Sequence, residues 1–196
     1  RTLVFLGAAG AYGDGQGDLS AEGVSRLTGL EMEMEEGRGK LNLHRCADDD
    51  ILKYLPPFYV INTPNVTTPF FHLKRTPETK VLFQDQRKPE PRALLGLRRF
   101  DDWTAIYSQA QSLPAPLLRG IAEDAGINIF NPHNGDVTYA ANRFHCVYTI
   151  DPGPRTFNAG IPAGTATDLL TGKKYDIANG KFSANLRSGT YYFLIE

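Results

Sequence analysis

Residues 2–13 read Thr-Leu-Val-Phe-Leu-Gly-Ala-Ala-Gly-Ala-Tyr-Gly, an apolar run that ends in a glycine-rich loop. Apolar residues followed at once by Gly7 are typical of a buried strand that leaves a sheet through a turn. A short helix is predicted next, because Ser20 is a suitable N-cap and Gly29 ends the segment. A strand, a loop and a helix in this order indicate the start of an α/β unit.

The same alternation of strand and helix signals continues to about Asn131. Helices are predicted at 49–55 and, most clearly, at 114–125, where proline lies in the first turn and the apolar side chains share one face. Short buried strands are predicted at 58–61, 81–83, 94–97 and 104–107, a loop at 62–77, and a solvated acidic segment at 31–36. This order predicts a parallel or mixed sheet flanked by helices over residues 1–132.

The pattern changes in the last third of the chain. Apolar and polar residues alternate from Ala140 to Ile150, which is the period of a strand with one buried face. Turn signals at 151–153, 171–172 and 179–180 then separate short strands up to Ile195. We therefore expect a small antiparallel β unit over residues 133–196.

The composition narrows the functional classes. The chain has 196 residues, of which 41% are hydrophobic and 22% are charged, as in ordinary folded proteins. Its net charge of −1 gives no electrostatic signature for nucleic acid or for an anionic membrane surface, and no apolar run is long enough to span a bilayer. Because the sequence starts at Arg1 rather than Met, we expect a piece of a longer polypeptide or a processed chain.

Metal and nucleophile sites have little support in the sequence. Cys46 and Cys146 are far apart, which excludes a disulfide scaffold or a Cys-based zinc site and leaves their redox state open. Neither has the flanking glycines of a nucleophile elbow, and Cys146 fits a small core residue. The four His residues lack ligand spacing, and the acidic runs 31–36 and 48–50 fit solvated faces or helix caps. We expect no metal and no other cofactor.

The glycine loop allows a second interpretation. Gly7, Gly10 and Gly13 have the spacing G-x-x-G-x-x-G and are similar to the nucleotide loop of extended short-chain dehydrogenases. Such a loop brings its backbone against a pyrophosphate at a helix N-terminus, so an NAD- or ADP-binding oxidoreductase-like domain is an alternative. Asp14 and Asp18 argue against it, because carboxylates in a phosphate cradle are unfavourable. A turn at the end of a strand is the simpler explanation.

Trp103 is the only tryptophan and lies beside two acidic residues, with Tyr107 nearby. An exposed Trp at this position would stack on a sugar ring, whereas a Trp at the start of a strand is more often part of the core. The sequence leaves both interpretations open.

Several short motifs follow one another from Trp103 to the end of the chain. They are WTAIYS (103–108), LPAPLLR (113–119), AEDAGI (122–127), GDVTYA (135–140), DLLTG (168–172) and LRSGTYYF (186–193). In this order the motifs resemble the C-terminal half of bacterial multidomain glycoside hydrolases related to the family 42 β-galactosidases. Residues 1–6 and 27–30 fit the start of the same region, whereas 31–92 match it only as a pattern of strands and loops.

The resemblance implies a degenerate amidotransferase-like (flavodoxin-like) α/β trimerisation domain at 1–132, followed by a small antiparallel β-sandwich at 133–196. It places the catalytic glutamates in an upstream barrel domain, so no catalytic residue is carried over to this chain. The expected function is a non-catalytic accessory region that supports self-association and contacts that barrel.

A carbohydrate contact through Trp103, Tyr107 and His133 is a further expectation. A stand-alone assembly or glycan-binding protein that uses the same two modules is the remaining alternative. The resemblance leaves the compartment open between the bacterial cytoplasm, the periplasm and the exterior.

Overall fold

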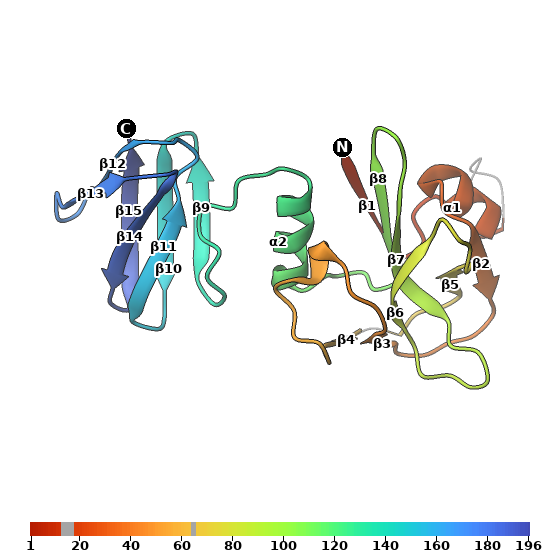
Figure 1. Ribbon diagram of the computed structural model, residues 1–196. Helices are drawn as coiled ribbons and strands as arrows, with labels where there is room; N and C mark the ends of the chain where they lie inside the picture. The colour runs from red at the N-terminus through yellow and green to blue at the C-terminus, as the bar shows by residue number, and fades with distance from the viewer. Residues whose placement is uncertain (13–17, 64–65) are drawn as a thin grey trace. The chain divides into compact units, whose positions relative to one another are not determined.

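The computed structural model describes residues 1–12, 18–63 and 66–196. It separates into two compact units, Arg1–Ala125 (unit 1) and Gly126–Glu196 (unit 2) (Figure 1). Each unit has its own sheets and its own hydrophobic core. Neither helix of the described part has the length and apolar character that a bilayer crossing requires.

Unit 1 is built on a curled mixed sheet of eight strands (Figure 1). The order along the sheet is β1-β8-β7-β6-β3-β4, and β5 connects β7 to β2. Strands β1 and β8 are parallel, whereas the other described pairs are antiparallel. The strands are β1 (Thr2–Leu6), β2 (Met32–Glu35), β3 (Asn42–Arg45), β4 (Val60–Asn62), β5 (Phe70–Leu73), β6 (Lys80–Gln84), β7 (Ala93–Arg99) and β8 (Thr104–Ser108).

Helix α1 (Ala21–Thr28) follows the glycine loop. The Ser20 hydroxyl accepts hydrogen bonds from the main-chain N–H groups of Glu22 and Gly23, which is the usual chemistry of an N-cap. The helix ends at Gly29, which has the left-handed conformation that glycine adopts without strain. The predicted start and end of this helix are both present.

Helix α2 (Ala115–Asp124) packs against a 3-10 helix, η1 (Asp50–Leu52) (Figure 1). Gly120 makes this contact possible, because the carbonyl oxygen of Ile51 lies where a β-carbon at residue 120 would be. The two segments therefore meet backbone against backbone.

Two hydrophobic clusters stabilise unit 1, and the side chains of β8 alternate between them. Ala105 and Tyr107 belong to the cluster that includes Val24 of α1, whereas Ile106 belongs to the cluster that includes Leu117 of α2 and Ile51 of η1. Each helix therefore covers the sheet through a different cluster.

The expected helix-flanked, flavodoxin-like α/β sheet is wrong. The structure is mostly β, and the described part of the chain has two α-helices and one parallel strand pair. The acidic segment expected to be solvated forms β2, and the expected loop at 62–77 contains β5. The helix expected at 49–55 is reduced to the single turn of η1. Neighbouring strands are thus mostly antiparallel, whereas the expected crossover helices would have connected parallel strands.

Unit 2 consists of antiparallel strand pairs. Its five-stranded sheet has the order β13-β12-β15-β10-β9, and β11 pairs with β14 in a second sheet. The strands are β9 (Val137–Ala141), β10 (Phe144–Thr149), β11 (Gly153–Asn158), β12 (Gly164–Asp168), β13 (Lys174–Ile177), β14 (Lys181–Leu186) and β15 (Gly189–Ile195).

An aromatic core joins the two sheets of unit 2. Phe157 of β11, Phe182 of β14 and Phe193 of β15 lie with ring centroids 5.0–5.4 Å apart. Phe130 stacks on Phe157 from the segment that precedes β9. Rings at these distances contribute beyond their buried area, which helps a unit of this size to fold.

Candidate functional site

Strand β1 forms one edge of the larger sheet, because among the described strands it is paired only with β8. Leu3, Val4 and Leu6 leave 51%, 37% and 38% of their surface exposed. An edge strand also has main-chain donors and acceptors that no neighbour uses. We call residues 2–6 the β1 edge, and its chemistry suits pairing with another polypeptide. The sequence had indicated a buried strand here, and the strand is present but lacks a second neighbour to cover it.

Tyr107 holds the end of β1 in place. Its hydroxyl donates to Gln109 Oε1 at 2.6 Å and lies 2.8 Å from the carbonyl oxygen of Gly7. The main-chain N–H of Gly7 in turn donates to the Ser108 carbonyl oxygen at 2.8 Å. Burial raises the pKa of the Tyr107 phenol, so the hydroxyl stays protonated at any ordinary pH.

The glycine loop after β1 is shaped by packing. Gly10 has φ of 81°, and a β-carbon on it would lie 2.8 Å from the side chain of Leu27 on α1. Gly7 also has positive φ, at 61°. Gly13, the third glycine of the motif, lies outside the described residues. Gly10 therefore allows the loop to approach Leu27 closely, and Gly7 allows the chain to turn after β1.

The N-terminus of α1 offers little to a phosphate. The Ser20 hydroxyl already accepts from the first-turn N–H groups, and Glu22 places a carboxylate in the same turn. In addition, β1 lies at the sheet edge, whereas a dinucleotide binds in a crevice between two parallel strands that are followed by helices. These features disfavour the nucleotide alternative.

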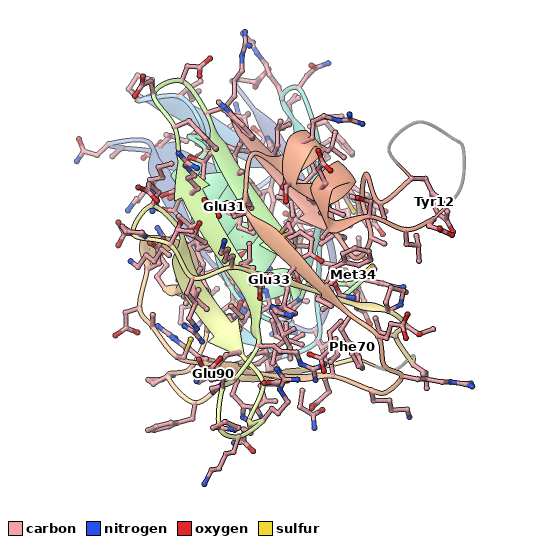
Figure 2. All side chains as sticks on the ribbon, turned by 90° about the vertical axis from the view of Figure 1, so that its right-hand side faces the viewer. Tyr12, Glu31, Glu33, Met34, Phe70 and Glu90 are labelled. Atoms are coloured by element: carbon pink, nitrogen blue, oxygen red, sulfur yellow. The ribbon has the colours of Figure 1, made fainter. Side chains whose placement is uncertain are left out.

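The acidic strand β2 is a second edge of the sheet, and its side chains alternate between two sides (Figure 2). On one side, Arg87 donates to both oxygens of Glu35 at 2.7 Å, and Glu33 lies 3.7 Å from His72. Just before the strand, Glu31 lies 3.4 Å from Lys74. Glu31, Glu33 and Glu35 therefore each have a cationic or His partner.

Met34 lies on the other side of β2, toward Tyr12 (Figure 2). The two side chains line a surface hollow of about 900 Å³ together with Asp18, Glu36 and Arg38. This hollow combines an exposed ring with charged groups, but none of its described lining residues is a Cys or His nucleophile.

Asp49 is the centre of an ion-pair cluster at the start of η1. Lys80 Nζ donates to it at 2.8 Å and Arg99 donates to it at 3.0 Å, while its side chain also accepts from the N–H of Ile51. Burial opposes ionisation of this carboxyl, but the hydrogen bonds from Arg99 and Lys80 outweigh burial and lower its pKa to about 2. The Asp49 carboxylate is therefore ionised near neutral pH and is held between two cations, an arrangement typical of a structural ion pair.

Unit 2 has a similar buried pair that the sequence did not reveal. Arg155 Nε donates to Asp136 Oδ2 at 2.8 Å, and Asn131 Nδ2 donates to the same oxygen at 3.0 Å. Burial opposes ionisation of Asp136, yet the bonds from Arg155, Asn131 and Thr149 lower its pKa to about 2. An Asp and an Arg 19 residues apart carry no sequence signal of pairing, because both are ordinary surface residue types.

The His and Cys residues are dispersed. His145 is buried in the core of unit 2, stacked on Phe130 with centroids 3.9 Å apart, and burial lowers its pKa. Cys46 is exposed in unit 1, and Cys146 is half-buried in unit 2. Within 1–12, 18–63 and 66–196, no cluster of three or more His, Cys, Asp or Glu side chains is arranged to hold a metal ion.

The three residues expected to contact carbohydrate occupy different environments. Trp103 is half-buried and stacks on Phe100 at 4.5 Å, with 6° between the rings. Tyr107 is fully buried. His133 is exposed in unit 2, with Nδ1 3.6 Å from Asp136 Oδ1. Trp103 immediately precedes β8 and Tyr107 lies within that strand, both in unit 1, whereas His133 belongs to unit 2.

Comparisons with known proteins give structural matches. Neither a family model nor a curated protein sequence matches the chain. Its fold is similar to part of a β-galactosidase from Bacillus circulans sp. alkalophilus, with a TM-score of 0.60 and 19% identity over 100% of this chain and 29% of that one. It is also similar to part of a catalytic mutant of Gan42B, a GH42 β-galactosidase from G. stearothermophilus, with a TM-score of 0.52 and 12% identity over 100% of this chain and 28% of that one. The chain thus spans less than a third of the length of both proteins.

Proposed function

We propose that this chain is an accessory region, corresponding to the C-terminal part, of a glycoside hydrolase of the GH42 β-galactosidase type. One observation carries the proposal: the similarity covers 100% of this chain, both units together, within a single β-galactosidase chain. The ordered motifs from Trp103 to Phe193 support the same assignment. At 19% identity the match itself concerns the fold, so the parent activity belongs to this proposal.

The accessory role is non-catalytic in this proposal. Retaining glycosidases need two carboxyl groups about 5 Å apart that are free to act as acid and nucleophile. The strongest acidic clusters of unit 1 are already engaged: Asp49 with Lys80 and Arg99, and Glu35 with Arg87. The lowered pKa of Asp49 keeps this carboxylate ionised near neutral pH, so it cannot donate the proton that a leaving sugar requires, and both oxygens of Glu35 are occupied by Arg87.

The β1 edge is the surface that we assign to self-association. It combines apolar side chains on both faces with unused main-chain hydrogen-bonding groups, so a second copy can extend the sheet. Pairing of two such edges gives a symmetric contact in which each strand contributes the same surface.

Sedimentation velocity of the purified chain over a wide range of concentration tests this role. The wild-type protein is expected to associate, and Val4→Lys is expected to stay monomeric, because a charge on an edge strand blocks pairing. Leu118→Lys is the matched control, since Leu118 is a similarly exposed apolar residue on α2. Circular dichroism confirms that each variant is folded. A wild-type monomer at every concentration, or equal effects of both substitutions, contradicts the assignment of the β1 edge.

A further inference from the structure

The five-stranded sheet of unit 2 has one face packed on the aromatic core and one face open to solvent. Along β10, His145, Val147 and Thr149 are buried, whereas Phe144 and Tyr148 are exposed. The strand therefore alternates strictly between the two faces. On β12 and β13 the open face is polar, with Thr167 and Lys174 in register with Leu194, but on β9, β10 and β15 it is mostly aromatic and requires explanation.

Strand register brings the open-face side chains together. Cys146 lies opposite Tyr139 of β9 on one side and opposite Tyr192 of β15 on the other. Phe144 lies opposite Leu194 in the next row, and its ring stacks on that of Tyr192 with centroids 5.9 Å apart. We call this surface the aromatic face: Tyr139, Phe144, Cys146, Tyr148, Tyr192 and Leu194.

The aromatic face carries no charge. The outward positions of β9, β10 and β15 contain no Lys, Arg, Asp or Glu. A nucleic-acid or anionic-glycan surface needs Lys or Arg beside its aromatic rings, and no outward position of β9, β10 or β15 supplies one; Lys174 lies on the same side of the sheet but two strands beyond β15. Three of its four rings are tyrosines, which combine an apolar ring with a hydroxyl at its tip.

We propose that the aromatic face of unit 2 binds an uncharged saccharide chain. Sugar rings have an apolar C–H face and a rim of hydroxyl groups, so they stack on exposed tyrosine and phenylalanine rings while their hydroxyls reach the tyrosine hydroxyls and water. Tyr139, at 70% exposure, and Tyr148, at 45%, present the most ring surface. Neutral hexose polymers match the absence of charge.

The size of the face distinguishes this ligand from a protein partner. The footprint of three neighbouring strands, with five residues along each strand, measures about 14 Å by 17 Å, or roughly 240 Å². A stable protein interface buries about 800 Å² on each partner. A second copy of the chain would therefore have to cover surface well beyond these six side chains, whereas a short run of sugar rings fits within their footprint.

Affinity electrophoresis in gels that contain a soluble neutral polysaccharide tests the proposal. The neutral probes are barley β-glucan, galactan and galactomannan, and polygalacturonate is the charged comparison. The wild-type chain is expected to be retarded by at least one neutral polymer. Tyr139→Ala and Tyr148→Ala are each expected to reduce the retardation at least about tenfold, in line with the loss of a well-stacked ring. Tyr12→Ala is the matched control, because Tyr12 is equally exposed but lies in unit 1.

Three outcomes overturn the proposal. They are no retardation of the wild type by any neutral polymer, an equal loss in Tyr12→Ala, and an association state that changes in Tyr139→Ala while retardation does not. The last result would identify a protein contact surface. Failure of self-association through the β1 edge leaves this test unaffected, because the two surfaces lie in different units.

Cys146 supplies a second measurement that does not depend on truncating a ring. In a Cys46→Ser background it is the only thiol of the chain, and it lies between Tyr139 and Tyr192. A saccharide on the aromatic face is expected to slow alkylation of Cys146 by at least about threefold, whereas polygalacturonate leaves the rate unchanged. An unchanged rate with a polymer that retards the protein would place the binding site elsewhere.

Discussion

Arg155 and Asp136 form an ion pair inside unit 2, with Arg155 Nε donating to Asp136 Oδ2 at 2.8 Å and both side chains almost completely buried. Arg155 also donates to the carbonyl oxygen of Asp151 at 2.8 Å, and Asp136 accepts from Asn131. The pair therefore connects the segment before β9, the turn after β10 and strand β11. Because the pair connects these three segments, breaking it is expected to destabilise unit 2.

Replacing Arg155 with Met is expected to destabilise the protein by about 3 kcal/mol or more, because it leaves a buried carboxylate without its cation. Urea unfolding followed by circular dichroism measures the change. Arg143→Met is the control, since Arg143 is exposed in the same unit and its loss is expected to cost less than about 0.5 kcal/mol. Similar losses in the two variants would show that the buried pair has no special role.

The free energy of unfolding is expected to fall as the pH drops from about 4 to about 2. Asp136 and Asp49 have folded-state pKa values of about 2, below the ordinary value of 3.8. A lowered pKa stabilises the fold above the unfolded-state pKa, and this contribution is lost as protons bind to the folded carboxylates. Urea titrations at several pH values measure the decline. Asp49→Asn is expected to flatten it, and a wild-type profile that is already flat would contradict the assignment.

Gly120→Ala is expected to destabilise unit 1 by about 3 kcal/mol, because its methyl group would collide with the main-chain carbonyl of Ile51 and force α2 away from η1. Thermal unfolding of unit 1 measures the loss. Gly39→Ala is the matched control, since the nearest atom to a β-carbon there is 3.6 Å away on the Phe70 ring. A stabilising effect of Gly120→Ala, as helix propensity alone predicts, would argue against the close contact.

Tyr107→Phe is expected to cost about 1–2 kcal/mol, because the buried hydrogen bond that its hydroxyl donates to Gln109 Oε1, beside the Gly7 carbonyl, is lost. Tyr139→Phe removes a hydroxyl from an exposed side chain and is expected to leave stability unchanged. Denaturant unfolding compares the two variants. Equal stability in both would mean that the Tyr107 hydroxyl does not fix the end of β1.

NAD and ADP are expected to leave the thermal midpoint of the protein unchanged. The N-terminus of α1 is capped by Ser20, and β1 lies at a sheet edge. A specific ligand at a hundred times its dissociation constant would stabilise the fold by about 2.7 kcal/mol, which thermal unfolding detects readily. A clear upward shift with either nucleotide would restore the alternative based on the loop that begins at Gly7.

The sequence predicted the local elements that carry strong end signals. Strand β1 and helices α1 and α2 lie where apolar periodicity, the Ser20 cap, Pro114 and the terminal glycines placed them. The strand pairing could not be predicted in the same way. The run Met32–Glu35 alternates Met with Glu, but its charge suggested a solvated segment. The Arg and His partners of its carboxylates lie 39 or more residues away in sequence, so the pairing was not visible.

The fold class was missed for a related reason. Alternating strand and helix signals suggest parallel crossovers, yet the 3-10 helix η1 is too short to connect two parallel strands. The aromatic face also escaped sequence analysis. The alternation from Ala140 to Ile150 was visible, but Phe144, Cys146 and Tyr148 are on the face that packing left open, and only the register with β9 and β15 shows this.

The central claim, that this chain is an accessory part of a larger glycoside hydrolase, is tested most directly by the mass of the native polypeptide that carries it. An antibody against unit 1 applied to extracts of the source organism measures that mass. Because the chain spans 28–29% of each of the two β-galactosidases described above, a single band more than three times the 21.7 kDa of this sequence is expected. That band should co-purify with hydrolysis of a neutral glycoside. A band at 21.7 kDa would contradict the claim and make a stand-alone assembly or glycan-binding protein the better account.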